Sequence, residues 1–240
     1  MTRSPLPDNP RVLLIGSGTM ADRFMLLLSE CELRPAYLEP DSVIGELTEF
    51  AVVVLASDRP LPGLEAELDE RCWRAGASWT SGLLVAQEFR IGPTVVPGRT
   101  PCHECWRRRV RSQAPDLAVH DAIRDLGVST VMRPWFTGTL AALHDQVAAI
   151  LAAEVMSLVS NSYPFPPDSR GRYWQGDAVY GHLQAHDFSY VGTCNRCVAV
   201  GKKRAGSHEL YHYARDRFAD SLRAAAQGDK SRGISARGAV

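Results

Sequence analysis

Two Cys-x-x-Cys pairs, far apart in the sequence, constrain the fold of this chain more than any other feature. Cys102 and Cys105 form the first pair, Cys194 and Cys197 form the second, and 88 residues lie between them. Each pair presents two thiols from one tight turn, and two such turns complete a tetrahedral zinc site with four cysteine ligands. The separation is too long for a zinc finger. The pairs therefore predict a structural Zn²⁺ that clips together two remote loops of one large domain.

The same pairs admit two other interpretations, a redox centre and a metal site that performs chemistry. A redox centre is typically a single pair at a helix N-terminus, where the thiol pKa is lowered. Four thiolates leave a zinc ion no open coordination position, so the ion would not activate water. We therefore prefer the structural interpretation and expect no catalytic residue in the chain.

The composition is typical of a substantial globular domain. The chain has 240 residues, of which 45% are hydrophobic, and 27 basic residues balance 27 acidic ones. The even balance gives no electrostatic reason to expect a nucleic acid or an anionic membrane as partner. No unbroken run of about 18 apolar residues exists, and the N-terminus lacks the apolar region of a signal peptide. We expect a cytoplasmic protein, where thiols stay reduced and free to bind metal.

Hydrophobic patterning predicts an α/β fold. A short apolar run at residues 12–15, a glycine turn and helically spaced apolar residues predict a strand, a tight turn and a helix. Further strands are predicted at 35–39 and 50–58, and a helix at 63–76. This alternation favours a doubly wound, Rossmann-like half over residues 10–76.

The second half is predicted over residues 77–208 and carries the zinc clip. Its expected elements are a strand and hairpin at 77–97, a short helix capped by Asp116, a long helix at 139–160 and short antiparallel strands within 163–190. A final helix is expected at 209–226. We expect one domain over residues 1–226, followed by a tail at 227–240 that is too polar to pack.

The glycine turn "GSGTMA" lies where a nucleotide-binding fingerprint would lie, between the first strand and the first helix. Gly16 and Gly18 would let backbone amides approach phosphates, although Ala21 stands at the third glycine position. Glu39 ends the second strand, where such folds hydrogen-bond a ribose. A strand–turn–helix without any ligand needs the same glycines for packing, so both interpretations stay open.

Several other cysteines and histidines are weaker candidates. Cys31 and Cys72 lie in predicted amphipathic helices, where packing is favoured over a nucleophilic role. His103 lies inside the first cysteine turn, and we expect it at the surface rather than on the metal. His182 and His186 would form a metal pair on a helix, but the local pattern predicts a strand.

The order of these motifs resembles the E1-like, or ThiF/MoeB-like, superfamily of adenylating enzymes over residues 10–200. The matching features are the glycine turn, an apolar strand ending at Asp58, a helix with Cys72 followed by Gly76, "GPTVVPGRTPCHEC", the long helix and "CNRC". The segment "GPTVVPGRTPCHECWRRR" is most similar to a degenerate branch, the cyclodehydratase E1-like or leader-peptide-binding proteins of azole-containing ribosomal peptide and bacteriocin biosynthesis. The resemblance implies a precursor (leader) peptide and a YcaO-family cyclodehydratase as partners, and a homodimer or a heterodimer with another E1-like chain.

Two departures from the superfamily bear on activity. Adenylating members carry an Asn-Leu-x-Arg-Gln segment and a lysine that grip the ATP phosphates, whereas "PDSVIGELTE" at residues 40–49 contains neither Arg nor Lys. We therefore do not expect ATP or Mg²⁺. Only a bound nucleotide would give Gly16, Gly18, Glu39 and Asp58 a binding role. The first strand also begins near residue 11, so no winged-helix peptide-recognition domain is expected ahead of it.

The sequence thus favours a non-catalytic E1-like component that holds a precursor peptide, a YcaO-type partner, or both. Strand addition at an exposed sheet edge is one possible mode of peptide binding. The alternative is an ATP-dependent enzyme that adenylates a peptide C-terminus, with Arg23 or Arg59 replacing the missing cations. A third interpretation is an assembly protein that only dimerises through the 139–160 helix.

Overall fold

The computed structural model describes residues 11–85, 87–125, 140–162, 171–177 and 180–197. All of them belong to one compact unit, which ends at Cys197. The predicted helix at 209–226, the predicted tail at 227–240 and the predicted domain limits at 208 and 226 lie outside the described residues.

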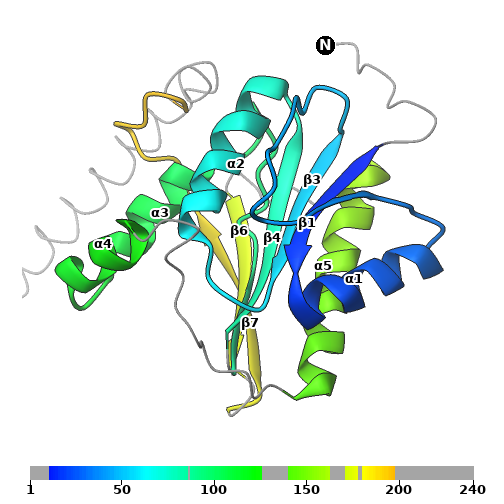
Figure 1. Cartoon of the computed structure of the whole chain (residues 1–240). Helices are drawn as coiled ribbons and strands as arrows, with labels where there is room; N and C mark the ends of the chain where they lie inside the picture. Colours follow the sequence, from blue (N-terminus) through cyan, green and yellow to red (C-terminus); the bar gives the residue numbers. More distant parts are fainter. Residues whose placement is uncertain (1–10, 86, 126–139, 163–170, 178–179, 198–240) are drawn as a thin grey trace, which may run out of the picture. The chain divides into compact units, whose positions relative to one another are not determined.

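A seven-stranded mixed sheet forms the centre of this unit, in the order β2-β1-β3-β4-β5-β6-β7 (Figure 1). The parallel strands are β1 (Val12–Ser17), β2 (Ala36–Leu38), β3 (Val52–Ser57) and β4 (Ser78–Val85). The antiparallel strands are β5 (Glu88–Ile91), β6 (Gly171–Asp177) and β7 (His182–Phe188). The mixed α/β sheet predicted from the sequence is confirmed.

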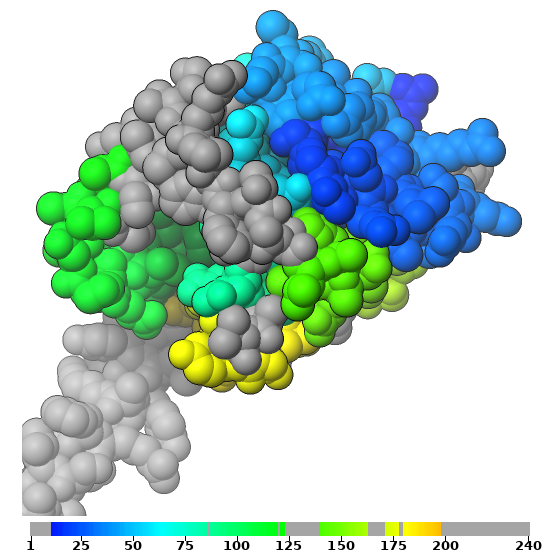
Figure 2. Space-filling view, turned by 60° about the horizontal axis from the view of Figure 1, so that its bottom comes forward, coloured from blue at the N-terminus to red at the C-terminus, as the bar shows by residue number. Residues whose placement is uncertain are grey.

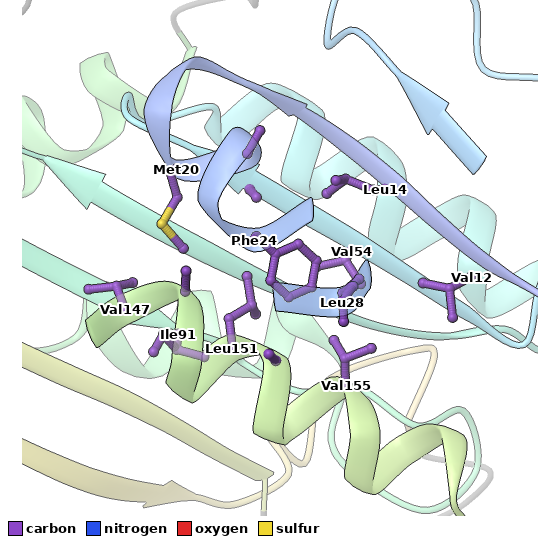
Figure 3. Close-up of a cluster of buried hydrophobic side chains, with 14 of the residues drawn as sticks. Val12, Leu14, Met20, Phe24, Leu28, Val54, Ile91, Val147, Leu151 and Val155 are labelled. Carbon is purple, nitrogen blue, oxygen red and sulfur yellow. The ribbon is translucent and has the colours of Figure 1, made fainter. Parts of the chain in front are cut away.

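Helices cover both faces of the central parallel strands, which explains why β1 and β3 begin as unbroken apolar runs. Helices α1 (Gly18–Glu30) and α5 (Ala141–Val159) lie on one face, and α2 (Pro62–Ala75) lies on the other (Figure 1). Alternate residues of β1 and β3 therefore enter two separate cores. Figure 3 shows the first core, where Phe24 of α1 and Leu151 of α5 meet Val54 of β3. Leu64 and Leu68 of α2 pack in the second.

By length and composition alone, helix α5 is long and apolar enough to cross a membrane, with a mean hydropathy of 1.4 over 18 residues. One side of it is nevertheless buried inside the protein, since Val147, Leu151 and Val155 are fully buried against α1 and the sheet. Leu140, within the predicted range 139–160, precedes the helix and is exposed. The buried stripe identifies α5 as a core helix of this fold.

Two short helices lie beyond α2. Helix α4 (Leu117–Asp125) begins as predicted, because the Asp116 Oδ1 atom accepts hydrogen bonds from the backbone N–H groups of Ala118 and Val119. Helix α3 (His103–Arg111) was not predicted from the sequence. Glu104 pairs with Arg107 and Arg108 at helical i+3 and i+4 spacing, a signal that could have revealed α3.

Candidate metal centre and nucleotide edge

The fold brings the two cysteine pairs together into one buried cluster. The four sulfur atoms lie within 4.8 Å of one another. The Sγ atom of Cys102 lies 3.9 Å from that of Cys105 and 3.6 Å from that of Cys194. A tetrahedral zinc with Zn–S bonds of about 2.3 Å separates its sulfurs by about 3.8 Å. The cluster therefore has the ligand type and spacing to hold a tetrahedral metal ion.

Backbone N–H groups point at these sulfurs, as they do around thiolate ligands. The N–H of Cys102 donates to Cys197 Sγ, and the N–H of Val191 donates to Cys105 Sγ, each at 3.4 Å. Hydrogen bonds from the Cys102 and Cys197 thiols lower the pKa of Cys105 to about 4. The same contacts raise the pKa of Cys197. The Cys105 thiol therefore ionises readily, while an incoming metal must displace a proton from Cys197.

Asp69 on α2 connects both cysteine turns to the body of the protein. Its side chain is 3% exposed. Its Oδ1 atom accepts the backbone N–H of His103, in the first turn, at 3.1 Å and the Nε1–H of Trp79 at 3.2 Å. Its Oδ2 atom pairs with Arg196, in the second turn. Burial raises the pKa of Asp69, an effect opposed by His103 and Arg196.

His103 is not at the surface, so the prediction made for it is wrong. The side chain is buried between two indoles, with ring centroids 5.4 Å from Trp79 and 5.0 Å from Trp106. Burial lowers its pKa. His103 is buried because the first turn of α3 packs onto α2 and β4. The local sequence does not encode this tertiary contact. As predicted, His103 is not part of the metal-ligating cluster.

Among the described residues, Cys31, Cys72, His182 and His186 have no evident chemical role. Cys72 is buried as predicted, and burial raises its pKa to about 12. Cys31 is exposed at the end of α1, so the packing role predicted for it is wrong. His182 and His186 lie on β7, a strand as predicted, and His186 stacks on Tyr173 with ring centroids 5.0 Å apart. In the described part of the chain, neither joins a group of metal ligands.

The four nucleotide-binding candidates also gather, at the carboxyl edge of β2, β1 and β3. Asp58 follows β3, and its Oδ1 atom accepts the backbone N–H of Met20, in the first turn of α1, at 3.0 Å. The other oxygen lies over Gly18, where an added Cβ would overlap it. His144 of α5 approaches the carboxylate from a third side, with Nε2 3.3 Å from Oδ1. Asp58 thus places an anion at the N-terminus of α1.

The ribose position carries a tyrosine. The Tyr37 hydroxyl lies 2.8 Å from the carbonyl oxygen of Gly16 and 2.9 Å from Oε1 of Glu39, so it can donate to either. Burial and the adjacent Glu39 carboxylate raise the pKa of Tyr37 to about 12, which keeps the hydroxyl protonated at neutral pH. Glu39 therefore already has a protein partner in the place where a ribose hydroxyl would bind.

Gly16 has a packing role that requires no ligand. A Cβ atom at Gly16 would lie 2.6 Å from the carbonyl oxygen of Ala56 on β3 and 2.8 Å from the Cβ of Ala21 on α1. Both contacts are with atoms that cannot swing aside. Close packing of β1, β3 and α1 is therefore sufficient to explain this glycine.

The two cations proposed as substitutes have different surroundings. Arg23 pairs with Asp145 of α5 at 3.3 Å. The Nε atom of Arg59 is buried, with no acceptor among the described residues. The link at residues 40–49 contributes Ile44 and Leu47 to the core beside α2, so it serves packing.

A groove that the sequence did not predict lies between α3 and the antiparallel strands. It comprises a cavity of about 630 Å³ over β4, β5 and β6, and an adjoining one of about 290 Å³ that reaches β7. Both are lined by Trp106, Val110, Gln113 and Tyr173. In Figure 2 the surface is hollowed between the helices α3 and α4, in green, and the strands in teal. No local motif could have revealed it, because segments far apart in the sequence form its walls.

No protein-family model and no curated protein matches the sequence. Solved structures do match. The heterocyclase TruD is 19% identical, with a TM-score of 0.58 over 79% of this chain and 27% of that one. E. coli MccB is 17% identical, with a TM-score of 0.54 over 79% of this chain and 65% of that one. The E. coli microcin synthetase McbBCD complex is 14% identical, with a TM-score of 0.60 over 81% of this chain and 70% of that one.

This chain thus spans about a quarter of TruD and about two thirds of MccB. At these identities the likeness concerns the fold. The protein therefore shares its fold with parts of the heterocyclase TruD, of MccB and of the microcin synthetase McbBCD complex.

Proposed function

We propose that this chain is an E1-like component of a heterocyclase system that forms thiazole or oxazole rings in ribosomal peptides. It binds the precursor peptide, a YcaO-type partner, or both, in the cytoplasm, and it does not adenylate the peptide. Holding the substrate beside the catalytic partner accelerates ring formation by proximity. The fold shared with TruD and with McbBCD, a heterocyclase and a microcin synthetase, supports the pathway.

The observation that carries the non-adenylating part is the position of the Asp58 carboxylate. A helix N-terminus after a glycine turn is the usual phosphate-binding position of this type of sheet. Here Asp58 accepts the N–H of Met20 and covers Gly18. A nucleotide phosphate would have to displace a carboxylate of the same charge, without a cation from residues 40–49 to compensate it.

We further propose that the cysteine cluster holds one structural Zn²⁺. Its four ligands are Cys102, Cys105, Cys194 and Cys197. Sulfur ligands favour zinc among the divalent ions of the cell, and four of them close the coordination sphere. The ion would hold α3 and the segment after β7 in place without taking part in chemistry.

Adenylation of a peptide C-terminus is the second candidate, because the similar protein MccB has been solved with ATP. In that case a nucleotide would displace Asp58 from α1, and the freed carboxylate would hold Mg²⁺. Asp58 would then be indispensable. Under our proposal it is only a helix cap, worth about 1 kcal/mol.

Reconstitution with the YcaO-family protein and precursor peptide encoded beside this gene tests the proposal. Omitting this chain should slow ring formation, measured by mass spectrometry as loss of one water per ring, by roughly a hundredfold at low peptide concentration. Asp58→Asn, which keeps an oxygen for the helix cap, should restore the full rate. An unchanged rate without the chain would contradict a role in holding the substrate.

A further inference from the structure

We propose that the groove between α3 and the antiparallel strands binds an extended peptide segment in which an apolar residue is followed by an acidic one. This inference rests on the proposed function, since it names the surface and the class of peptide that it accepts. It is carried by the size of the groove and, among the described residues, by two buried donors without acceptors and an arginine without a carboxylate partner.

The groove has the dimensions of a short extended peptide. It crosses the sheet from Val85, at the end of β4, past Arg90 and Gln175 to His186 on β7. Four strands spaced about 4.8 Å apart give a path of about 14 Å, which about four extended residues would fill. A cavity of about 630 Å³ also lies within the range typical of small-ligand sites.

The middle of the groove suits an apolar side chain. Trp106 and Val110 of α3 and Tyr173 of β6 line it together. The Trp106 and Tyr173 rings meet edge to face, with centroids 5.9 Å apart. Leu83, Val85 and Phe89 extend the apolar lining towards β4. An aliphatic or aromatic residue placed here would be removed from water on several sides.

Two N–H donors beside this apolar middle lack acceptors. Arg90 lies over the Trp106 ring, with its guanidinium carbon 4.3 Å from the ring centroid, and one of its nitrogens pairs with Glu65. The other nitrogen, Nη1, and the indole Nε1 of Trp106 are buried, with no acceptor among the described residues. Both residues line the cavity. Buried donors are normally paired. A carbonyl or carboxylate oxygen of a peptide in the groove would supply the missing acceptors.

The end of the groove at β7 has an uncompensated positive charge. Arg109 donates to Ser189 Oγ at 2.9 Å and to the carbonyl of Tyr190 at 3.1 Å, both neutral acceptors. Asp187 lies in the same cavity but pairs with Arg172 at 3.2 Å. No carboxylate among the described residues pairs with Arg109. An acidic side chain that follows the apolar one would therefore find an opposite charge.

Binding of a labelled peptide to the zinc-loaded full chain tests this assignment. The probe is a fluorescein-labelled Gly-Ser-Leu-Leu-Glu-Ser-Gly peptide, followed by anisotropy, and the comparison peptides carry Gln for Glu or Ser for both Leu. We expect each change in the peptide to weaken binding about tenfold or more. Arg109→Gln should remove the preference for Glu over Gln and leave the Gln peptide bound as before. Arg74→Gln, which removes an exposed arginine of α2 outside the groove, is the matched control.

Three results would overturn the assignment. They are equal binding of all three peptides, an Arg109→Gln variant that behaves like Arg74→Gln, and a concentration-dependent dimer in sedimentation that the peptide displaces, which would make a second copy the occupant. Circular dichroism and zinc content verify that each variant is folded. If the peptide binds as expected but ring formation never needs this chain, the proposed function fails and the assignment of the groove as a peptide site holds. If ring formation needs the chain and Arg109→Gln changes nothing, only the groove assignment fails.

Discussion

Replacing both Cys102 and Cys105 by serine should abolish zinc binding and unfold the region built from α3 and residues 189–197. Structural zinc contributes about 10–16 kcal/mol in zinc-finger peptides at neutral pH, which is as large as the whole stability of a typical domain, about 5–15 kcal/mol. The two sheet cores contain none of these cysteines, so part of the fold can persist without the metal. The expected product is therefore a partly folded chain that aggregates easily.

Metal analysis of the purified variant, together with a thermal melt, measures both effects. Wild type should contain one zinc per chain and melt cooperatively, and the double variant should contain none and lose that transition. Cys31→Ser is the control, because Cys31 is exposed and lies outside the cluster. A zinc-free double variant that melts like wild type would show that the cluster has no structural role.

Asp69→Ala should destabilise the protein by about 3 kcal/mol, near the lower end of the range for breaking a buried ion pair because Arg196 is partly exposed. The change leaves three donors without their acceptor: the N–H of His103, the indole N–H of Trp79 and the Arg196 guanidinium. Since Asp69 fixes both cysteine turns, zinc affinity should also fall, by roughly 10- to 100-fold. Asp69→Asn, which keeps one acceptor oxygen, should give an intermediate loss.

Urea unfolding and the rate of zinc transfer to a chromogenic chelator measure these two consequences. Glu70→Ala is the matched control, because Glu70 is the next residue of α2 and makes only an exposed pair with Arg74. If Asp69→Ala unfolds and releases zinc like Glu70→Ala, then Asp69 does not organise the metal centre.

Features with a regular period or spacing could be predicted from the sequence. The continuous apolar run that became β3 requires cover on both faces, and the stripe on α5 requires one buried side. Four cysteines in two tight turns have few arrangements other than a single cluster, and the structure brings them within 4.8 Å.

Features that depend on contacts between distant segments could not be predicted. His103 is buried because α3 packs on α2 and β4. The groove exists only because α3 lies opposite β5 and the paired strands β6 and β7. These three parts are far apart in the sequence. The hydrogen bond from the Met20 N–H to Asp58 joins residues 38 positions apart, so the sequence around the glycine turn does not reveal it. Local patterns contain none of this information.

Titration calorimetry of the zinc-loaded protein with ATP and Mg²⁺ tests the central claim most directly. The proposal that Asp58 occupies the phosphate position predicts no heat of binding, with or without precursor peptide. A micromolar dissociation constant that is lost in Asp58→Ala would contradict it and would make the chain an adenylating enzyme.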